Sequence, residues 1–247
     1  TGSYADPSAR PDPAVNARHA TLSRLSLKQC QAGYLDLTNA VVRGDLDLHG
    51  LQSPAPDGLC RVEAPGIRIE GSFRAPSATL RLAPSPSGDP DRPSEYALNL
   101  ADATVTGQVQ LRPQFVARGG VSIRSAEIQK DVWADGAHLS ASGNWALYAQ
   151  AARIGGVAAL GYRYRRGDAP PEESADDPSH RAGRFLAEGG LSLFGARMGY
   201  LDMRGATLRQ QPGESNNQFV CDLATIEQSV NLSPYVSDRS GAAASVP

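Results

Sequence analysis

Short runs of alternating hydrophobic and polar residues fill most of the chain, and small residues or glycines separate one run from the next. The segment from Phe185 to Leu208 shows this most clearly, because leucine or methionine recurs at alternate positions while Ala196 and Ala206 fill two further apolar slots. Alternation with a period of two places the apolar side chains on one face of a β-strand. The pattern therefore predicts short strands that are joined by glycine-containing corners.

One template recurs in a single register through the second half of the chain. It consists of two apolar residues two positions apart, a small residue three positions later and another apolar residue two positions after that. Five copies begin at Leu98, Val121, Leu147, Leu191 and Phe219, so successive copies start 23, 26, 44 and 28 residues apart. This spacing predicts coils of about 22 residues that carry loops of different lengths.

Each copy is followed, after a corner, by a second apolar pair, and the two pairs together predict the core. The second pairs are Val109/Leu111, Val132/Ala134, Ala158/Leu160, Leu201/Met203 and Val230/Leu232. A longer period is also visible, since residues 115–128 realign with residues 185–198, which indicates a structural unit of two coils. The side chains expected in the core are Leu98, Leu100, Val121, Ile123, Leu191, Leu193, Leu201 and Met203.

This repetition predicts an all-β fold, a single-stranded, parallel, right-handed β-helix (β-solenoid) of about six to seven coils with projecting loops. Proline-rich and charged segments divide the chain further. We expect residues 1–20 to form an irregular leader or N-terminal cap, and residues 21–236 to form the solenoid. Loops are expected at 84–94 and 165–184, and a flexible tail at 237–247.

Composition and cysteine usage add few constraints. The chain is 40% hydrophobic and 20% charged with a net charge of −2, as expected of a folded protein, and this charge gives no reason to expect a nucleic-acid partner. Cys30 and Cys221 occupy slots that alanine or leucine fills elsewhere, so small buried thiols are the favoured interpretation. No apolar run is long enough to span a bilayer, so we expect membrane contact only through segments outside this sequence.

Three aspartates sit between inward apolar residues and are expected to point outward: Asp36, Asp47 and Asp202. Parallel β-helices that act on polysaccharides place carboxylates on one face. A ladder of such aspartates could hold Ca²⁺ or flank a glycosidic bond. The interpretation that we favour is that these are polar positions which keep the repeat soluble.

A second candidate surface consists of aromatic and basic residues. Trp133 follows the inward Val132 and is expected to face outward, where it could stack on a ligand. A short aromatic and basic run precedes the longest insertion, and it could bind a partner, although a solvated loop edge is the favoured interpretation. The run comprises Tyr162, Arg163, Tyr164, Arg165 and Arg166.

The repeat resembles a group of bacterial β-solenoid proteins built on the pattern G-x-L-x-L-x-G-A-r-[IM]-G-x-L-D-[LM]-x-G-A-x-L. Gly190 to Leu208 match it, Gly120 to Leu139 match more loosely, and Gly44 to Leu48 contain a third trace. Members of this group are sometimes labelled membrane-associated oxidoreductases. The repeats also look distantly like bactofilins, which polymerise end to end, and like pentapeptide-repeat proteins. The resemblance implies a bacterial protein that is cytoplasmic or membrane-associated.

The sequence contains no convergent set of catalytic or ligand residues. No G-x-G-x-x-G opens a helix, so we expect no cofactor, and we expect no metal site, since no spacing typical of metal ligands is present. We therefore favour a non-enzymatic scaffold or interaction module that binds another protein or another copy of itself, through an edge coil that has to be covered. The alternatives are a carbohydrate-binding or carbohydrate-active β-helix, and a membrane-apposed solenoid whose anchor lies outside this sequence.

Overall fold

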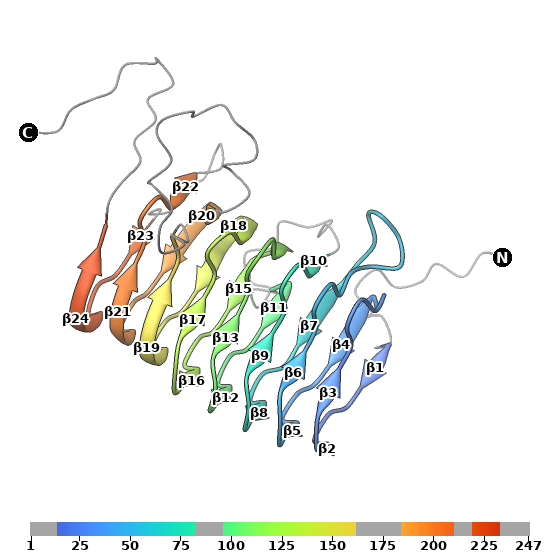
Figure 1. Ribbon diagram of the computed structural model, residues 1–247. Helices are drawn as coiled ribbons and strands as arrows, with labels where there is room; N and C mark the ends of the chain where they lie inside the picture. Colours follow the sequence, from blue (N-terminus) through green and yellow to red (C-terminus); the bar gives the residue numbers. More distant parts are fainter. Residues whose placement is uncertain (1–13, 83–95, 162–183, 210–218, 233–247) are drawn as a thin grey trace, which may run out of the picture.

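The structure is a computed structural model that describes residues 14–82, 96–161, 184–209 and 219–232. In these ranges every regular element is a strand, and there is no helix. The strands stack along one axis, with β1 at one end and β24 at the other (Figure 1). The all-β solenoid that the sequence predicts is therefore confirmed.

The chain winds in four-sided coils, and most sides are strands of two or three residues. The first two coils contain β1 (Val15–Asn16), β2 (Thr21–Leu22), β3 (Leu25–Ser26), β4 (Tyr34–Asp36), β5 (Val41–Val42) and β6 (Leu46–Asp47). The third and fourth contain β7 (Arg61–Glu63), β8 (Arg68–Ile69), β9 (Phe73–Arg74), β10 (Thr79–Arg81), β11 (Leu98–Asn99), β12 (Thr104–Val105), β13 (Val109–Gln110) and β14 (Val116–Arg118).

Later coils contain longer strands that continue around a corner from one side to the next. Short strands β15 (Val121–Ser122), β16 (Glu127–Ile128) and β17 (Val132–Trp133) lead into β18 (His138–Tyr148), β19 (Arg153–Ala159), β20 (Leu186–Ser192) and β21 (Arg197–Asp202). The last strands are β22 (Thr207–Arg209), β23 (Phe219–Val220) and β24 (Thr225–Asn231). Because β18 to β21 turn corners, the four sides merge into two sheets, of 11 and 13 strands.

Each strand pairs in parallel with the strands of the coils before and after it. The first side contains β1, β4, β7, β11, β15, β18, β20 and β23 in that order. The second side contains β2, β5, β8, β12, β16 and the first parts of β19, β21 and β24, and the third contains β3, β6, β9, β13, β17 and the last parts of β19, β21 and β24. The described residues thus give seven complete coils and three sides of an eighth. Neighbouring coils in such a stack lie ~4.8 Å apart. The first coil begins at Val15, which pairs with Leu35, so the solenoid starts inside the segment expected to be a leader. The reason is that Val15 and Ala17 already fill inward slots.

The register predicted from the five template copies is confirmed. Leu98 pairs with Val121, Val121 with Leu147, Leu147 with Leu191, and Leu191 with Phe219. The two-coil unit is confirmed as well, because Val116 and Leu186 both pair with His138 and so lie two coils apart. The alternation and the spacing of the apolar slots were sufficient to align Leu147 with Leu191, although 44 residues separate them.

Tight turns with a left-handed residue form many of the corners. In one of them the amide of Ala40 donates to the carbonyl of Leu37 at 3.0 Å, and Asn39 between them has a φ of 53°. This geometry resembles a type II turn, in which the third residue needs a positive φ. The residue after the turn faces the core, which explains why the template requires a small residue there.

The interior is filled by side chains of all four sides. Its largest fully buried members include Phe73, Phe115 and Phe185. The eight side chains named above as the expected core are at most 7% exposed, whereas Val230 and Leu232 of the last predicted pair are 45% and 56% exposed. The loops expected at 84–94 and 165–184 lie outside the described residues, apart from residue 184, and so does the expected tail.

Candidate functional site

The three outward aspartates are not stacked on one another. Asp36 belongs to the first side of the solenoid, whereas Asp47 and Asp202 belong to the third side and lie in distant coils. The register neighbours of Asp47 are Ser26 and Arg74. The acidic ladder that was the alternative interpretation is therefore absent among these residues, because their slots are filled by other residue types in the intervening coils.

These aspartates instead stabilise corners of the backbone. In each case one carboxylate oxygen accepts a hydrogen bond at 3.1 Å from the backbone amide two residues later, the amides of Thr38, His49 and Arg204. The carboxylates also form ion pairs, Asp36 with Arg18, Asp47 with Lys28 and Asp202 with Arg204. A carboxylate that is neutralised and already bound to its own backbone is poorly placed to act on a substrate.

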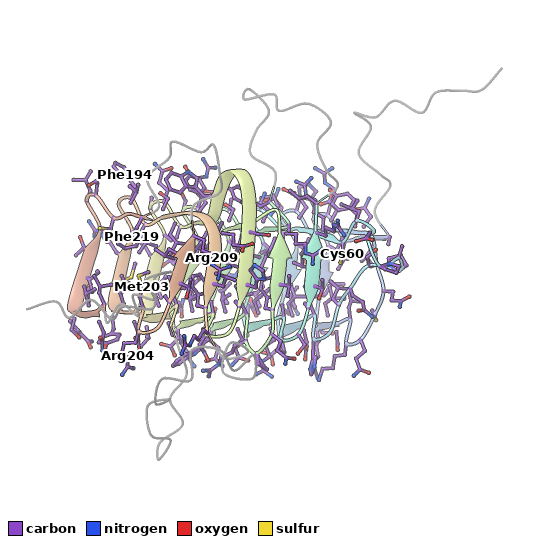
Figure 2. All side chains as sticks on the ribbon, turned by 90° about the horizontal axis from the view of Figure 1, so that it is seen from above. Cys60, Phe194, Met203, Arg204, Arg209 and Phe219 are labelled. Carbon is purple, nitrogen blue, oxygen red and sulfur yellow. The ribbon has the colours of Figure 1, made fainter. Side chains whose placement is uncertain are left out.

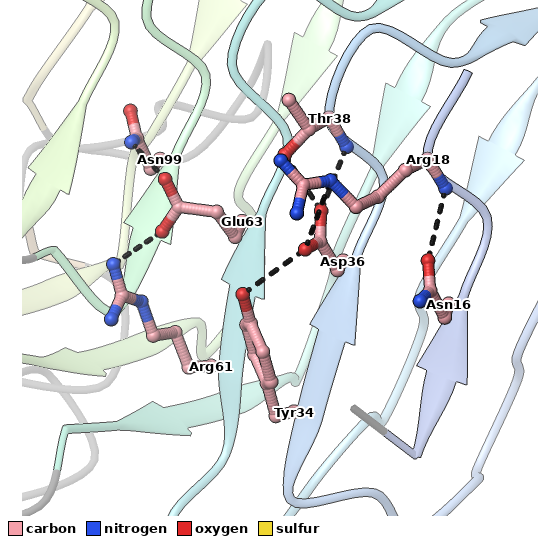
Figure 3. Close-up of polar contacts among 8 residues, drawn as sticks. All are labelled: Asn16, Arg18, Tyr34, Asp36, Thr38, Arg61, Glu63 and Asn99. Carbon is pink, nitrogen blue, oxygen red and sulfur yellow. Dashed lines mark hydrogen bonds and ion pairs between the residues drawn. The ribbon is translucent and has the colours of Figure 1, made fainter. Parts of the chain in front are cut away.

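A buried polar cluster covers part of the first side (Figure 3). Arg61 and Glu63, each 7% exposed, form an ion pair, and Asn99 donates to the second Glu63 oxygen at 2.6 Å. The Tyr34 hydroxyl donates to Asp36 at 3.4 Å, while the Arg61 guanidinium lies 6.0 Å from the Tyr34 ring centre. Opposite charges and hydrogen bonds compensate the burial of these groups, so the cluster joins neighbouring coils.

Trp133 lies on the third side and is half-buried. Its ring nitrogen donates to the side-chain oxygen of Gln108 at 3.2 Å, and the guanidinium of Arg112 lies 4.2 Å from its ring centre. Asp135 holds Arg112 in turn, at 3.1 Å. The cation–π contact occupies one face of the ring, so at most the other face of Trp133 can stack on a ligand.

The other candidate residues from the sequence either lie outside the described ranges or do not come together into a cluster. The run from Tyr162 to Arg166 lies outside the described residues. Within the described ranges, no three His, Cys, Asp or Glu side chains come close enough to hold a metal ion. The same ranges contain no helix that is long and apolar enough to cross a membrane.

The last coil exposes residues that occupy core slots. Val230 of β24 pairs with Leu201 of β21, yet Val230 is 45% exposed whereas Leu201 is 1% exposed. Leu232, which follows β24, is 56% exposed. Phe219 lies near this end of the stack, far from Cys60 (Figure 2). Nothing among the described residues packs on the outer edge of β23 and β24, which is why these apolar side chains are exposed.

The exposure of the cysteines also differs between the ends and the middle of the stack. Cys60 is fully buried, and burial raises the pKa of its thiol to about 12. Cys30 of the first coil is half-buried, whereas Cys221 of the last coil is exposed. The expectation of a buried thiol at Cys221 is therefore wrong. Its slot is a core slot, but no described coil follows to cover it.

A groove on the second side escaped sequence reasoning. It has a volume of about 230 Å³ and crosses the strands that begin with Glu127, Arg153 and Arg197. The signal that could have revealed it is a tetrapeptide, Ala-Arg-apolar-Gly, which occurs at 152–155 and again at 196–199.

No protein-family model, curated protein or solved structure matches this chain. The resemblance to bacterial β-solenoid repeats thus stays a prediction that rests on the sequence motif. The surfaces of the solenoid itself are the basis on which a function can be argued.

Proposed function

We propose that this protein is a non-enzymatic β-helical scaffold that assembles end to end, with the last coil of one copy stacked on the first coil of the next. The observation that carries this proposal is the exposure of core-slot residues on β23 and β24. In earlier coils the same slots are buried by the coil that follows. A second copy would supply that coil, together with partners for the free backbone groups of the edge.

The two ends have matching slots. If the observed register is continued by one more coil, Val230 falls beside Leu25 of the next copy and Leu232 falls beside Leu27. Leu25 and Leu27 are themselves only partly buried in the first coil. The paired strands of both ends run in the same direction along the chain, so a further parallel rung keeps the geometry of the existing stack.

The charges of the two ends are complementary. Residues 14–33, which form the first coil, contain Arg18, Arg24 and Lys28 and no carboxylate, and the second coil pairs Arg18 with Asp36 and Lys28 with Asp47. Residues 219–232, which form the last coil, contain Asp222 and Glu227 and no lysine or arginine. Opposite charges favour contact between unlike ends and disfavour contact between like ends. Contacts of this head-to-tail kind do not close on themselves, so they produce a filament rather than a dimer.

The carbohydrate-active alternative has less support. The aspartates on which it depended lie on different sides or in distant coils, and each is held by a cation and a backbone amide. No arrangement of the described residues favours glycosidic chemistry.

The test is light scattering coupled to size-exclusion chromatography across a wide concentration range, with negative-stain images of the largest species. We expect the mass to rise with concentration and to fall at high salt, and we expect rods in the images. The double variant Val230→Arg, Leu232→Arg places charges in the contact and should be monomeric throughout.

A control is Thr106→Arg, which adds one of the two arginines at an exposed position on the second side, away from both ends, and should assemble like the parent protein. Circular dichroism confirms that all variants keep the β-helix. A monomer at every concentration, or assembly that the double variant does not change, would overturn the proposal.

A further inference from the structure

The groove on the second side brings together side chains from successive coils. Glu127 of β16 pairs in register with Arg153 of β19, which pairs with Arg197 of β21. The two arginines therefore occupy directly adjacent rungs. The groove is lined by Glu127, Gln129, Arg153, Gly155, Arg197 and Glu227, among others.

Arg153 and Arg197 differ from most arginines of the solenoid. Within the described ranges neither guanidinium group forms an ion pair or a side-chain hydrogen bond, and both residues are exposed. Arginines on the other sides typically have a carboxylate partner, as Arg112 has Asp135 and Arg204 has Asp202. Like charges directly opposite on neighbouring strands destabilise a sheet. An anion between the two guanidinium groups would remove that repulsion.

Glycines keep the groove open beside the arginines. A Cβ atom on Gly155 would lie 2.2 Å from the carbonyl oxygen of Gln129, and one on Gly199 would lie 3.0 Å from the carbonyl oxygen of Gly156. Side chains at these two positions are therefore costly. The register shifts after Ile154 in β19 and again after Met198 in β21, where both strands turn the corner. The repeated tetrapeptide thus builds a concave surface and places one arginine on it in each coil.

We propose that this groove binds an oxyanion, a carboxylate or a phosphate, between Arg153 and Arg197. The guanidinium groups of Arg153 and Arg197 lie on neighbouring strands, and each is planar and offers several N–H donors to one compact anion. Glu127 and Glu227 limit the positive surface at either end, and the Gln129 side chain offers an uncharged donor and acceptor. This arrangement fits a small anionic group that carries hydroxyls beside it, as in a uronic acid or a sugar phosphate.

The experiment is calorimetric titration of the full chain with glucuronate, with glucose 6-phosphate and with glucose. Saturable binding of either anion, weakened by salt, and no binding of glucose are the expected results. The two anions distinguish a carboxylate ligand from a phosphate ligand. Arg153→Gln and Arg197→Gln should each weaken the binding by about tenfold, which is about 1.4 kcal/mol.

Arg124→Gln is the control, because Arg124 is also exposed but has a partner, Asp102, at 3.4 Å. It should bind like the parent protein. The titrations are repeated with Val230→Arg, Leu232→Arg, so that a failure of end-to-end assembly does not affect the result. The proposal is overturned if neither anion binds, if glucose binds equally well, or if both glutamine variants retain parental affinity.

Discussion

Leu193 illustrates what single residues contribute to this molecule. It is 2% exposed and its amide donates to the carbonyl of Val220 in the next coil at 2.7 Å. The next residue, Phe194, is 37% exposed. Two neighbouring positions of similar hydrophobicity thus differ completely in environment, because Leu193 continues the inward alternation of β20 whereas Phe194 lies in the turn that follows.

Replacing Leu193 by arginine should unfold the protein or lower its melting temperature strongly. The loss should exceed the about 2–5 kcal/mol that truncation of a buried leucine costs, because an unpaired charge enters the core as well. Phe194→Arg introduces the same charge one residue later and should change the melting temperature little. Thermal unfolding followed by circular dichroism measures both. Equal melting temperatures for the two variants would contradict the assigned register.

At the scale of elements, the tight turns at the corners set the direction in which the chain enters the next side of a coil. Ala151 has a φ of 55° and is exposed, while Ala152 after it is fully buried in a small-residue slot. A left-handed φ is unfavourable for a residue with a Cβ atom but not for glycine. The turn therefore stores strain at Ala151 and requires a methyl-sized side chain at Ala152.

Ala151→Gly should raise the free energy of unfolding by about 1 kcal/mol, since glycine relieves the left-handed strain. Ala152→Gly should lower it by about 1 kcal/mol, because a buried methyl group is lost and the unfolded chain gains freedom. Chemical denaturation of the two variants gives the comparison. Destabilisation by both would indicate that the entropy of glycine outweighs the strain at this corner.

At the scale of the whole molecule, the two ends of the solenoid differ from its middle. The first coil is cationic and the last is anionic, and both expose apolar slots that are buried in the middle coils. Cys221 lies in one such slot at the last coil, whereas Cys60 lies in the interior. The reactivity of Cys221 therefore shows whether the last coil is covered, and the reactivity of Cys60 shows whether the protein is folded.

A thiol reagent at pH 8 should modify Cys221 quickly and Cys60 only on unfolding, since burial raises the pKa of Cys60 to about 12 and keeps the reagent away. If copies stack end to end, modification of Cys221 should slow as protein concentration rises. The monomeric variant Val230→Arg, Leu232→Arg should show no such slowing. Mass spectrometry of the modified peptides identifies each site, and a concentration-independent rate at Cys221 would argue against a covered last coil.

The sequence alone determined the strand architecture and the register of the inward slots. Leu98, Val121, Leu147, Leu191 and Phe219 align in the structure as the template predicts. The physical reason is that a solenoid is held by contacts between equivalent positions of neighbouring coils, so the pattern of buried residues repeats along the chain and can be read locally.

The tertiary structure alone decided which outward residues are available to a partner. Asp36, Asp47 and Trp133 look accessible in the alternating pattern, yet neighbouring coils supply a cation to each of them. Arg153 and Arg197 lie 44 positions apart and become adjacent only when the coils stack, with no carboxylate close enough to pair with either within the described ranges. Pairing between coils depends on side-chain directions in space, and the period-two pattern of one strand does not contain that information.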